Sequence, residues 1–325
     1  MESIRCNLCD TGKTDLLFSK KDKFRISEDD FNVVRCKNCG LIYVNPRPTQ
    51  EEIAKFYPDT YSWKETLKAA SFFSRIIRKT ERAYRYHNLN YEVKKVLEVA
   101  KINSGKVLDL GCGVGDRLDI FRQKGFDTHG VEISSAALYA RDFFKLNVIQ
   151  GDLYRASYPG DFFDIVSVYN VLEHTHAPKE VLKALGRVTK DGGVLALQVP
   201  NSRCLQFKIF KKQWAACDVP RDLCYFNDGL LKKILADCGL QVLCVDHFSN
   251  WWHPPTIVTS LFPGLDPQKS WLVEKEEKSS TLRRCCWIFW TLLLPLFTFL
   301  ESLVGRGAII TVYAKKIKQN RDSRC

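Results

Sequence analysis

The stretch Lys106–Glu132, KVLDLGCGVGDRLDIFRQKGFDTHGVE, decides the fold. An apolar run is followed by glycines at alternate positions, then by a helix-patterned segment, and finally by a second short run that ends in a carboxylate. This order predicts a strand, a tight turn, a helix and a second strand. Glycine is needed where a backbone turns sharply and a ligand approaches without a Cβ in between. We therefore expect Gly111, Gly113 and Gly115 to form a ligand-binding turn, with Glu132 beside it.

The segments after this stretch continue the alternation of strands and helices. Such alternation favours right-handed crossovers and a doubly wound, parallel α/β sheet, which binds ligands at the carboxyl ends of its strands. Strands are predicted at Lys106–Leu110, Thr128–Val131, Val148–Gln150, Phe163–Tyr169, Val194–Val199, Leu240–Phe248 and Ala308–Lys315. Helices are predicted at Asp116–Lys124, Ser135–Phe144, Lys179–Val188 and Asp228–Cys238.

The composition is that of a globular protein with a basic surface. The chain has 325 residues, of which 45% are hydrophobic, so it can bury a full core. A formal net charge of +12 favours anionic partners: nucleic acid, acidic lipid or a phosphorylated substrate. The 13 cysteines are odd in number, and the N-terminus lacks the apolar core of a signal peptide. We therefore expect a reducing cytoplasm.

Two CxxC pairs stand near the N-terminus, formed by Cys6 with Cys9 and by Cys36 with Cys39. Four thiolates in this spacing can close a tetrahedral site, which in proteins usually holds Zn2+. Because four protein ligands leave no open position, we expect a structural zinc ribbon over residues 1–48; the alternative is four reduced cysteines without a metal. Residues 41–48 are predicted to be a ribbon strand that runs into a proline-containing linker.

A basic amphipathic helix is predicted from Lys64 to Lys95, within a linking segment at residues 49–103. Apolar side chains recur there at spacings of four and three, and the lysines and arginines lie mainly off this stripe. The pattern favours a helix that covers the main domain with a solvated basic face. Contact with nucleic acid or lipid is the alternative.

The successive motifs between Lys106 and Asn201 resemble those of class I S-adenosylmethionine-dependent methyltransferases. Asp116 stands where a nicotinamide-binding G-x-G-x-x-G turn needs its third glycine, so that fold is disfavoured. The resemblance implies a seven-stranded, mostly parallel sheet in a domain at residues 104–325, with S-adenosylmethionine as the cofactor. The matching motifs are VLDLGCGVGDRL, GVEIS, Gly151-Asp152, YNVLEH and DGGVLALQVPN.

The same resemblance implies which residues meet the cofactor. The backbone of the glycine turn would hold the methionine end, and Asp109 would pair with its ammonium group. Glu132 would accept both ribose hydroxyls. The other implied positions are Gly111, Cys112, Gly113 and Gly115 in the turn, Ile133 flanking the adenine, Asp152 on the adenine amino group with Leu153 beside it, and Tyr169 and Asn170 near the sulfonium.

A hydroxyl acceptor usually needs a base, and His174 is the best-placed candidate. It follows the fourth strand on the cofactor side, next to Glu173, and an unperturbed pKa near ~6.5 suits proton removal at neutral pH. The alternative is that this pair only braces the next helix. Asp222 lies in a Pro-Arg-Asp-Leu motif, where similar glycan and secondary-metabolite methyltransferases carry Pro-Arg-His-Leu, and it can also accept a proton. Asn170 replaces an acid of the ubiquinone-biosynthesis O-methyltransferases, so no catalytic metal is expected.

An apolar insertion is expected between the last two strands, at about residues 249–307. Its uncharged run Cys285–Leu300 is shorter than the about 20 residues of a membrane span and contains Pro295. One crossing would also put two strands of a single sheet on opposite sides of a bilayer. The remaining alternatives are a lid over a lipophilic acceptor, an oligomer contact, a re-entrant segment, or a helix pair that docks on anionic lipid. Tryptophans and a basic C-terminal tail accompany the run: Trp251, Trp252, Trp271, Trp287, Trp290, Lys315, Lys316, Lys318, Arg321 and Arg324.

These features predict a methyltransferase that acts on an oxygen of a small-molecule, glycan or lipid-linked acceptor. An RNA methyltransferase is the second hypothesis, suggested by the charge and the zinc ribbon. A catalytically idle, cofactor-binding assembly protein is the third, suggested by Asn170 and Asp222. A basic loop after the fifth strand holds an anionic acceptor or is simply solvated; it comprises Arg203, Lys208, Lys211 and Lys212. Attachment to the inner face of a membrane would follow from lipid docking, and the oligomeric state is open.

Overall fold

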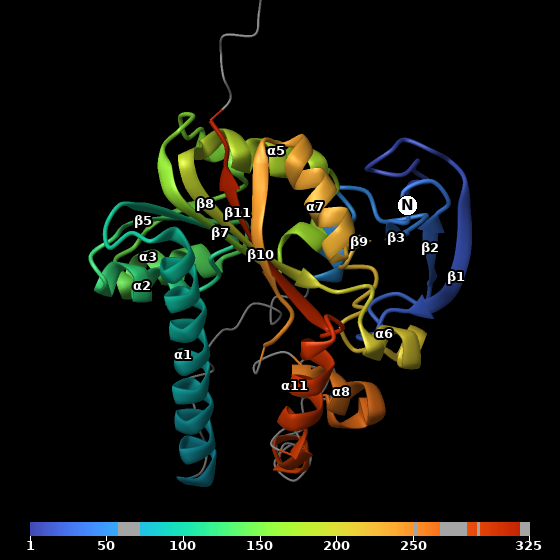
Figure 1. The fold of residues 1–325 in the computed structure, drawn as a ribbon. Coiled ribbons are helices and arrows are strands. Elements are labelled where there is room, and N and C mark those ends of the chain that lie inside the picture. Colours follow the sequence, from blue (N-terminus) through green and yellow to red (C-terminus); the bar gives the residue numbers. More distant parts are fainter. Residues whose placement is uncertain (58–71, 250–252, 267–284, 291–292, 319–325) are drawn as a thin grey trace, which may run out of the picture.

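The computed structural model describes residues 1–57, 72–249, 253–266, 285–290 and 293–318. Within these residues the chain forms a seven-stranded sheet with helices on both faces and a smaller four-stranded sheet beside it (Figure 1). Several expectations fall outside the described residues: the first turns of the helix expected from Lys64, the side chains of Trp251, Trp252 and Trp271, and Arg321 and Arg324 in the tail.

The large sheet has the strand order β10-β11-β8-β7-β4-β5-β6. Strands β6, β5, β4, β7 and β8 run parallel, whereas β11 is antiparallel to both of its neighbours, β8 and β10. This is the predicted doubly wound, mostly parallel sheet with an antiparallel pair at one edge. The bounds are β4 Lys106–Leu110, β5 Asp127–Glu132, β6 Asn147–Gln150, β7 Phe163–Tyr169, β8 Thr189–Pro200, β10 Leu240–Asp246 and β11 Ile309–Lys316.

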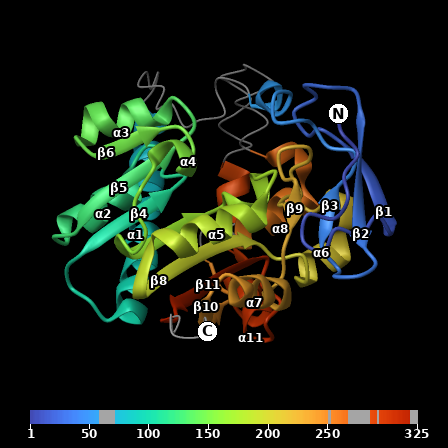
Figure 2. The ribbon, with the colours of Figure 1, turned by 90° about the horizontal axis from the view of Figure 1, so that it is seen from above.

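Helices cover both faces of this sheet (Figure 2). Because side chains alternate along a strand, Val107 packs toward α1 and α2, whereas its neighbour Leu108 packs toward α5. Both faces are therefore apolar, as a parallel sheet requires. One face carries α1 (Phe72–Ala100), α2 (Asp116–Gln123) and α3 (Ala136–Phe144), and the other carries α4 (Leu153–Ala156), α5 (Pro178–Val188) and α7 (Asp228–Asp237).

The small sheet joins the N-terminal segment to the main domain. Its order is β1-β2-β3-β9, with β1 Thr14–Lys21, β2 Asp30–Cys36, β3 Ile42–Val44 and β9 Cys224–Tyr225. Strand β9 comes from far along the chain and pairs Tyr225 with Ile42. The two parts also share a buried cluster that includes Phe31, Phe207 and Trp214. The expected ribbon is thus packed on the main domain, and its limit at residue 48 stays a prediction.

The insertion leaves the sheet after β10 and returns at β11. These strands pair antiparallel, with Leu240 opposite Lys316, so both ends of the insertion lie in one sheet. Among the described residues, no helix combines the length and the apolar character needed to cross a bilayer. The insertion and its surroundings contain α6 (Leu205–Phe210), α8 (His253–Leu261), a helical segment at residues 285–290, and α11 (Pro295–Leu303). Short 3-10 turns occur at η1 (Ile53–Phe56), η2 (Leu172–His174), η3 (Lys211–Gln213) and η4 (Pro263–Leu265).

Candidate functional site

The candidate site lies at the carboxyl ends of the parallel strands. The glycine turn follows β4, Glu132 ends β5, Asp152 follows β6 and Asn170 follows β7. These strands are neighbours in the order β7-β4-β5-β6, so the four positions lie along one edge of the sheet. Ligands of doubly wound sheets bind at this edge.

The glycine turn leaves open space at its centre. Gly111, Gly113 and Gly115 have φ values of +73°, +55° and +91°, a region that residues with a Cβ rarely adopt. A Cβ at Gly111 would lie 2.2 Å from Cγ2 of Val171, and one at Gly115 would lie 2.7 Å from Cδ1 of Leu146. At Gly113 an added Cβ would meet nothing within 4 Å. Packing therefore requires two of the glycines, whereas Gly113 borders a space that a ligand can enter.

Glu132 faces this turn. Its Oε2 accepts a hydrogen bond from the backbone N–H of Gly113 at 2.9 Å, and its Oε1 accepts one from Ser134 at 2.7 Å. Each carboxylate oxygen has a further lone pair, so Glu132 can still accept hydrogen bonds from hydroxyl groups. The next side chain, Ile133, is 72% exposed, which places a large apolar group at the rim of the site.

Asp109 does not present its carboxylate to a ligand. The residue is fully buried; its Oδ1 accepts a hydrogen bond from the Ser167 hydroxyl at 2.6 Å, and its Oδ2 lies 3.5 Å from Nη1 of Arg117. Burial raises the pKa of Asp109, although the positive charge of Arg117 opposes this shift. The expected direct pairing with an ammonium group is therefore not available in this conformation. The sequence did not predict a role for Arg117, because its only signal is a basic residue two positions after Gly115.

Tyr169 also differs from expectation. Its side chain is enclosed in the core between α1 and the sheet, with the Arg117 guanidinium 3.7 Å from the ring centroid. Only its backbone, at the end of β7, reaches the edge of the site. Asn170 has a positive φ of +54°, and its side-chain amide donates to Oε1 of Gln198 at 3.4 Å. That bond ties the residue to the neighbouring strand β8.

The other expected cofactor positions act mainly through the backbone or through packing. Asp152 caps α4, and its Oδ1 accepts a hydrogen bond from the backbone N–H of Arg155 at 2.8 Å. This bond uses one carboxylate oxygen and leaves the second for a ligand. Leu153 and Cys112 are both buried, the latter in a cluster between α2 and α3.

His174, Glu173 and Asp222 come together beside this edge. Nδ1 of His174 lies 3.1 Å from Oδ1 of Asp222 and 3.0 Å from the carbonyl oxygen of Arg221. The backbone N–H of Leu223 donates to the Glu173 carbonyl at 2.8 Å, which fixes the two loops to each other. The structure thus brings Asp222 to the adjacent residues Glu173 and His174, from which it is distant in sequence.

The charges of this group change the acid–base expectation. Burial would lower the pKa of His174, but the hydrogen bond with Asp222 and the negative charges of Glu173 and Asp222 outweigh it and raise the pKa to about 10. Burial raises the pKa of Glu173 to about 8, only partly opposed by the charge of His174. His174 therefore holds its proton more tightly than a free imidazole, which corrects the expected value near ~6.5. Oε2 of Glu173 is buried and has no hydrogen-bond partner within the described part of the chain.

The N-terminal segment contributes to this group, which the sequence did not reveal. The ring of Tyr57 packs edge-on against His174, with centroids 6.4 Å apart. Arg221, next to Asp222, is fully buried and binds Asp22 at 2.5 Å, Asp218 at 2.6 Å and the Phe56 carbonyl at 3.0 Å. A buried guanidinium with paired carboxylates holds both segments in one arrangement. The N-terminal segment therefore positions the loop that carries Asp222.

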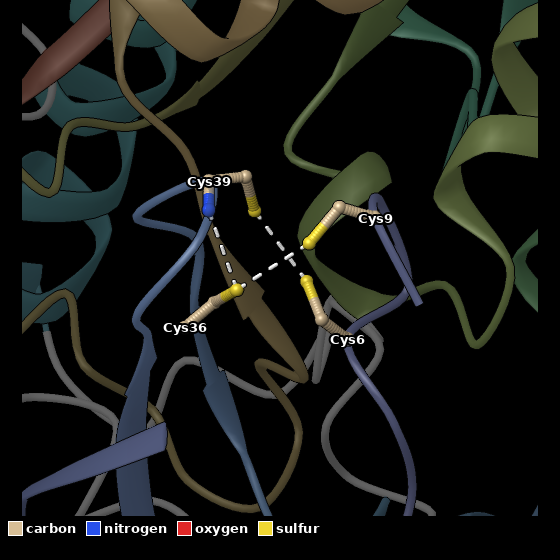
Figure 3. Close-up of side chains that lie close together, drawn as sticks. All are labelled: Cys6, Cys9, Cys36 and Cys39. Carbon is tan, nitrogen blue, oxygen red and sulfur yellow. Dashed lines mark hydrogen bonds between the residues drawn. The ribbon is translucent and has the colours of Figure 1, made fainter. Parts of the chain in front are cut away.

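The four N-terminal cysteines form a compact group (Figure 3). Their sulfur atoms all lie within 4.8 Å of one another, and two pairs, Cys6 with Cys39 and Cys9 with Cys36, are 3.5 Å apart. Four sulfurs at ~2.3 Å from a tetrahedral ion would be about 3.8 Å apart, so this donor set fits Zn2+. The backbone N–H of Cys39 also donates to Sγ of Cys36 at 3.4 Å.

Comparison with known proteins identifies the family. A family model described as a methyltransferase domain matches residues 81–245, about half of the chain. The chain belongs to this methyltransferase family.

Curated relatives and solved structures were also found. The chain is 28% identical over 137 residues to the ubiquinone biosynthesis O-methyltransferase of Thiobacillus denitrificans, covering 36% of this chain and 59% of that protein. It is 30% identical over 124 residues to the protein of the same name from Pseudomonas aeruginosa UCBPP-PA14, covering 35% and 53%. The chain thus spans little more than half the length of these relatives. A solved methyltransferase from Archaeoglobus fulgidus matches at 20% identity and a TM-score of 0.47, covering 74% of this chain and 99% of that one.

The edge described above fits a methyltransferase donor in most respects. Open space beside Gly113, the carboxylate of Glu132 and the exposed side chain of Ile133 suit a sulfonium nucleoside. The side chains of Asp109 and Tyr169 are buried instead, and both contact Arg117.

Proposed function

We propose that the protein is an S-adenosylmethionine-dependent methyltransferase that acts on an oxygen of a small-molecule, glycan or lipid-linked acceptor. The observation that carries the proposal is the pairing of the open glycine turn with Glu132, joined by the 2.9 Å bond from Gly113. A turn of this kind at the end of β4, followed by an acid at the end of β5, suits a ligand with a ribose. When bound, the donor supplies an electrophilic methyl group.

We propose that the donor is held by the residues that the family resemblance implies. Glu132 accepts the ribose hydroxyls, Ile133 flanks the adenine, and Asp152, with Leu153 behind it, accepts from the adenine amino group. The backbone of the turn and of residues 169–170 lines the methionine end. Asp109 holds Arg117 in place, and meets the ammonium group only if Arg117 moves aside.

His174 is the proposed general base for the acceptor hydroxyl. Its Nδ1 is committed to Asp222 and to the Arg221 carbonyl, so the other ring nitrogen is the one that can take a proton from the acceptor. The side chain of His174 is 28% exposed, which makes it reachable. Asp222 orients the ring and stabilises its protonated form. Above its own pKa of about 8, buried Glu173 adds a second negative charge beside the ring. Because the pKa of His174 is raised, the ring is unprotonated, and so able to take the acceptor's proton, mainly in alkaline solution.

The acceptor class is inferred from the curated relatives and from the insertion. The two curated relatives named above are O-methyltransferases, which supports transfer to oxygen. The apolar insertion suits an acceptor that is lipophilic or lipid-linked. A glycan or another small molecule is compatible with the same site.

We also propose that Cys6, Cys9, Cys36 and Cys39 hold a structural Zn2+. The ion would fix the N-terminal segment, whose Asn7 donates from its side-chain amide to the His176 carbonyl at 3.1 Å, two residues after His174. Metal analysis of the purified protein should find about one zinc per chain. The Cys36→Ser/Cys39→Ser variant should lose it, whereas Cys244→Ser, an exposed cysteine outside the group, should keep it. A folded wild-type protein without metal would refute the site.

The function is tested with methyl-labelled S-adenosylmethionine and extracts of lipid, glycan and RNA. Label in the lipid or glycan fraction, lost in His174→Ala, is the expected result. Label that appears only in RNA would overturn the acceptor proposal in favour of an RNA methyltransferase. Cofactor binding without label in any fraction would instead favour an idle, cofactor-binding assembly protein.

A further inference from the structure

Helix α11 buries polar side chains and exposes apolar ones, the opposite of a helix at a water-facing surface. Its polar residues Thr298 and Glu301 are buried, whereas its apolar side chains face outward. The outward residues are Leu296 at 71% exposed, Phe297 at 46%, Phe299 at 45%, Leu300 at 53% and Leu303 at 65%. A helix that packs on a protein in water normally buries its apolar side and exposes its polar one.

The inward polar residues explain how the reversed helix is held. Glu301 accepts hydrogen bonds from the backbone N–H of Gln206 at 3.2 Å and from its side-chain amide at 3.0 Å. The Thr256 hydroxyl on α8 donates to Oε1 of Gln206 at 2.8 Å, and the Ser260 hydroxyl on the same helix accepts from the backbone of Ala215 at 2.9 Å. A buried polar network therefore joins α6, α8 and α11. The orientation of α11 is specified by these bonds.

The apolar surface extends beyond α11. Further exposed apolar residues lie nearby in the described part of the chain. They are Val304 at 69% exposed, Phe289 at 59%, Leu293 at 56%, Leu261 at 51%, Phe262 at 42% and Trp290 at 40%. Ring contacts join this group, with Trp290 5.8 Å from Phe262 and 5.9 Å from Phe289. Figure 1 shows α8 and α11 projecting together from the end of the sheet. We call these side chains, with those of α11, the apolar face. A group of exposed apolar side chains on neighbouring helices indicates an interaction site, and its exposure in the described residues argues against a dry lid.

Basic side chains are carried by α6, which is bonded to α11, and by η3, which follows α6. Lys208 on α6 and Lys211 and Lys212 in η3 are exposed, and α6 is bonded to α11 through Gln206. The backbone N–H of Leu205 also donates to the Arg306 carbonyl at 3.1 Å, which places the start of α6 beside the residues that follow α11. These three lysines, with the net charge of +12, favour a negatively charged partner.

We propose that the apolar face docks on an anionic lipid bilayer, with its leucine, phenylalanine and tryptophan side chains at the acyl boundary and Lys208, Lys211 and Lys212 at the headgroups. Apolar side chains flanked by lysines are the pattern of interfacial membrane segments. Both ends of the insertion belong to one sheet, which excludes a single crossing of the bilayer. A symmetric dimer would bring like patches together and so place basic groups near one another. The proposal does not depend on the methyl-transfer proposal.

The test is flotation of the full-length protein with vesicles. Wild-type protein should float with phosphatidylcholine–phosphatidylglycerol vesicles, and more weakly with phosphatidylcholine alone. The Leu296→Gln/Leu300→Gln/Leu303→Gln variant should partition at least ~10-fold less, because it removes apolar groups that would enter the bilayer. The control, Leu16→Gln/Leu243→Gln/Ile317→Gln, changes three other exposed apolar residues, away from α11, and should float as the wild type does. Lys208→Gln/Lys211→Gln/Lys212→Gln should lose most of the difference between the two vesicle types.

Three results would overturn the proposal. One is wild-type protein that does not float with anionic vesicles. Another is equal flotation of the triple-leucine variant. The third is a wild-type dimer in sedimentation velocity that this variant dissociates, which would assign the apolar face to a second copy. Circular dichroism checks the fold of each variant, and quenching of wild-type tryptophan fluorescence by brominated lipid tests the same claim without any substitution. S-adenosylmethionine binding is measured in parallel, so failure of the docking proposal is distinguishable from failure of the enzyme proposal.

Discussion

His174 and Asp222 form an ion pair in which Nδ1 of the ring lies 3.1 Å from Oδ1 of the carboxylate. The ring is held from a loop that follows β7, whereas the carboxylate comes from the loop before β9. The second loop is fixed to the N-terminal segment through Arg221 and Asp22. The acid–base properties of the candidate catalytic group therefore depend on a segment outside the matched methyltransferase domain.

The Asp222→Asn substitution should lower the pKa of His174 toward ~6.5. The folded-state pKa of about 10 lies above the unfolded value, so the protonated ring stabilises the fold fully below ~6.5 and loses this contribution as the pH rises through about 10. The variant should be less stable than the wild type in acid and nearly as stable above pH about 10. The pH at which the rate of methyl transfer rises should be lower in the variant. Titration of the imidazole by NMR measures this shift. Asp237→Asn, an equal charge change at an exposed site, is the control; an unshifted pKa in Asp222→Asn would contradict the assignment.

Glu173→Gln should make stability less dependent on pH. Burial raises the pKa of Glu173 to about 8, so the folded state binds this proton more tightly than the unfolded state, in which the value is ~4.3. Stability of the wild type therefore falls as the pH rises from ~4.3 to about 8, and glutamine removes this term. The free energy of unfolding of each protein is measured in urea near pH ~5 and near pH ~9. The value for the variant minus that for the wild type should be at least about 1 kcal/mol larger near pH ~9 than near pH ~5. Parallel pH profiles of the two proteins would show that Glu173 is not buried in its neutral form.

Arg221→Lys should destabilise the protein strongly. The fully buried guanidinium binds two carboxylates and a carbonyl, and an ammonium group cannot reproduce this fork. Breaking a buried pair costs about 3–5 kcal/mol, whereas Arg5→Lys, in an exposed pair with Asp10, should change stability by less than about 1 kcal/mol. Equilibrium unfolding in denaturant measures both. Equal and small effects would mean that the N-terminal segment is not tied to the loop of Asp222.

Gly113→Ala should weaken cofactor binding more than it weakens the fold. The added Cβ meets no protein atom within 4 Å, so the cost in stability is the about 1–2 kcal/mol of a left-handed residue. It would, however, enter the space assigned to the donor, and the affinity should fall at least ~10-fold. Gly125→Ala is the matched control, because φ at Gly125 is +88° and the space is equally open, but the residue lies in the turn after α2. Equal donor affinities in the two variants would place the ligand elsewhere.

The sequence predicted the central sheet well because its signals are local. The strands Lys106–Leu110 and Phe163–Tyr169 begin and end where expected, since each is an apolar run bounded by turn residues. Strand β8 begins at Thr189, earlier than the expected Val194, because Thr189 pairs with Phe163 of β7 and residues 190–193 form an irregularity before the regular pairing resumes at Val194. Likewise, the two-residue strand β9 exists only through its pairing with β3.

The site was predicted by position and less well by side-chain orientation. Glu132 and the glycine turn lie at the predicted edge because their backbone geometry follows from the motif. Asp109 and Tyr169 are enclosed because Arg117 covers the Asp109 carboxylate and packs on the Tyr169 ring. Arg117 itself is held by Glu92 on α1 at 2.8 Å. Tyr57 reaches His174, and Arg221 reaches Asp22, through contacts between distant segments, which spacing along the chain cannot show. The reversed orientation of α11 depends in the same way on a buried hydrogen bond to Gln206.

Calorimetric titration of the full-length protein with S-adenosylmethionine tests the central claim most directly. The wild type should bind the donor, and Glu132→Gln should weaken binding by roughly 10- to 100-fold, the effect of losing charge-assisted hydrogen bonds worth about 1.5–3 kcal/mol. Glu51→Gln, an exposed acid in the N-terminal segment, should bind as the wild type does. A wild type that does not bind, or a Glu132→Gln variant with unchanged affinity, would contradict the account.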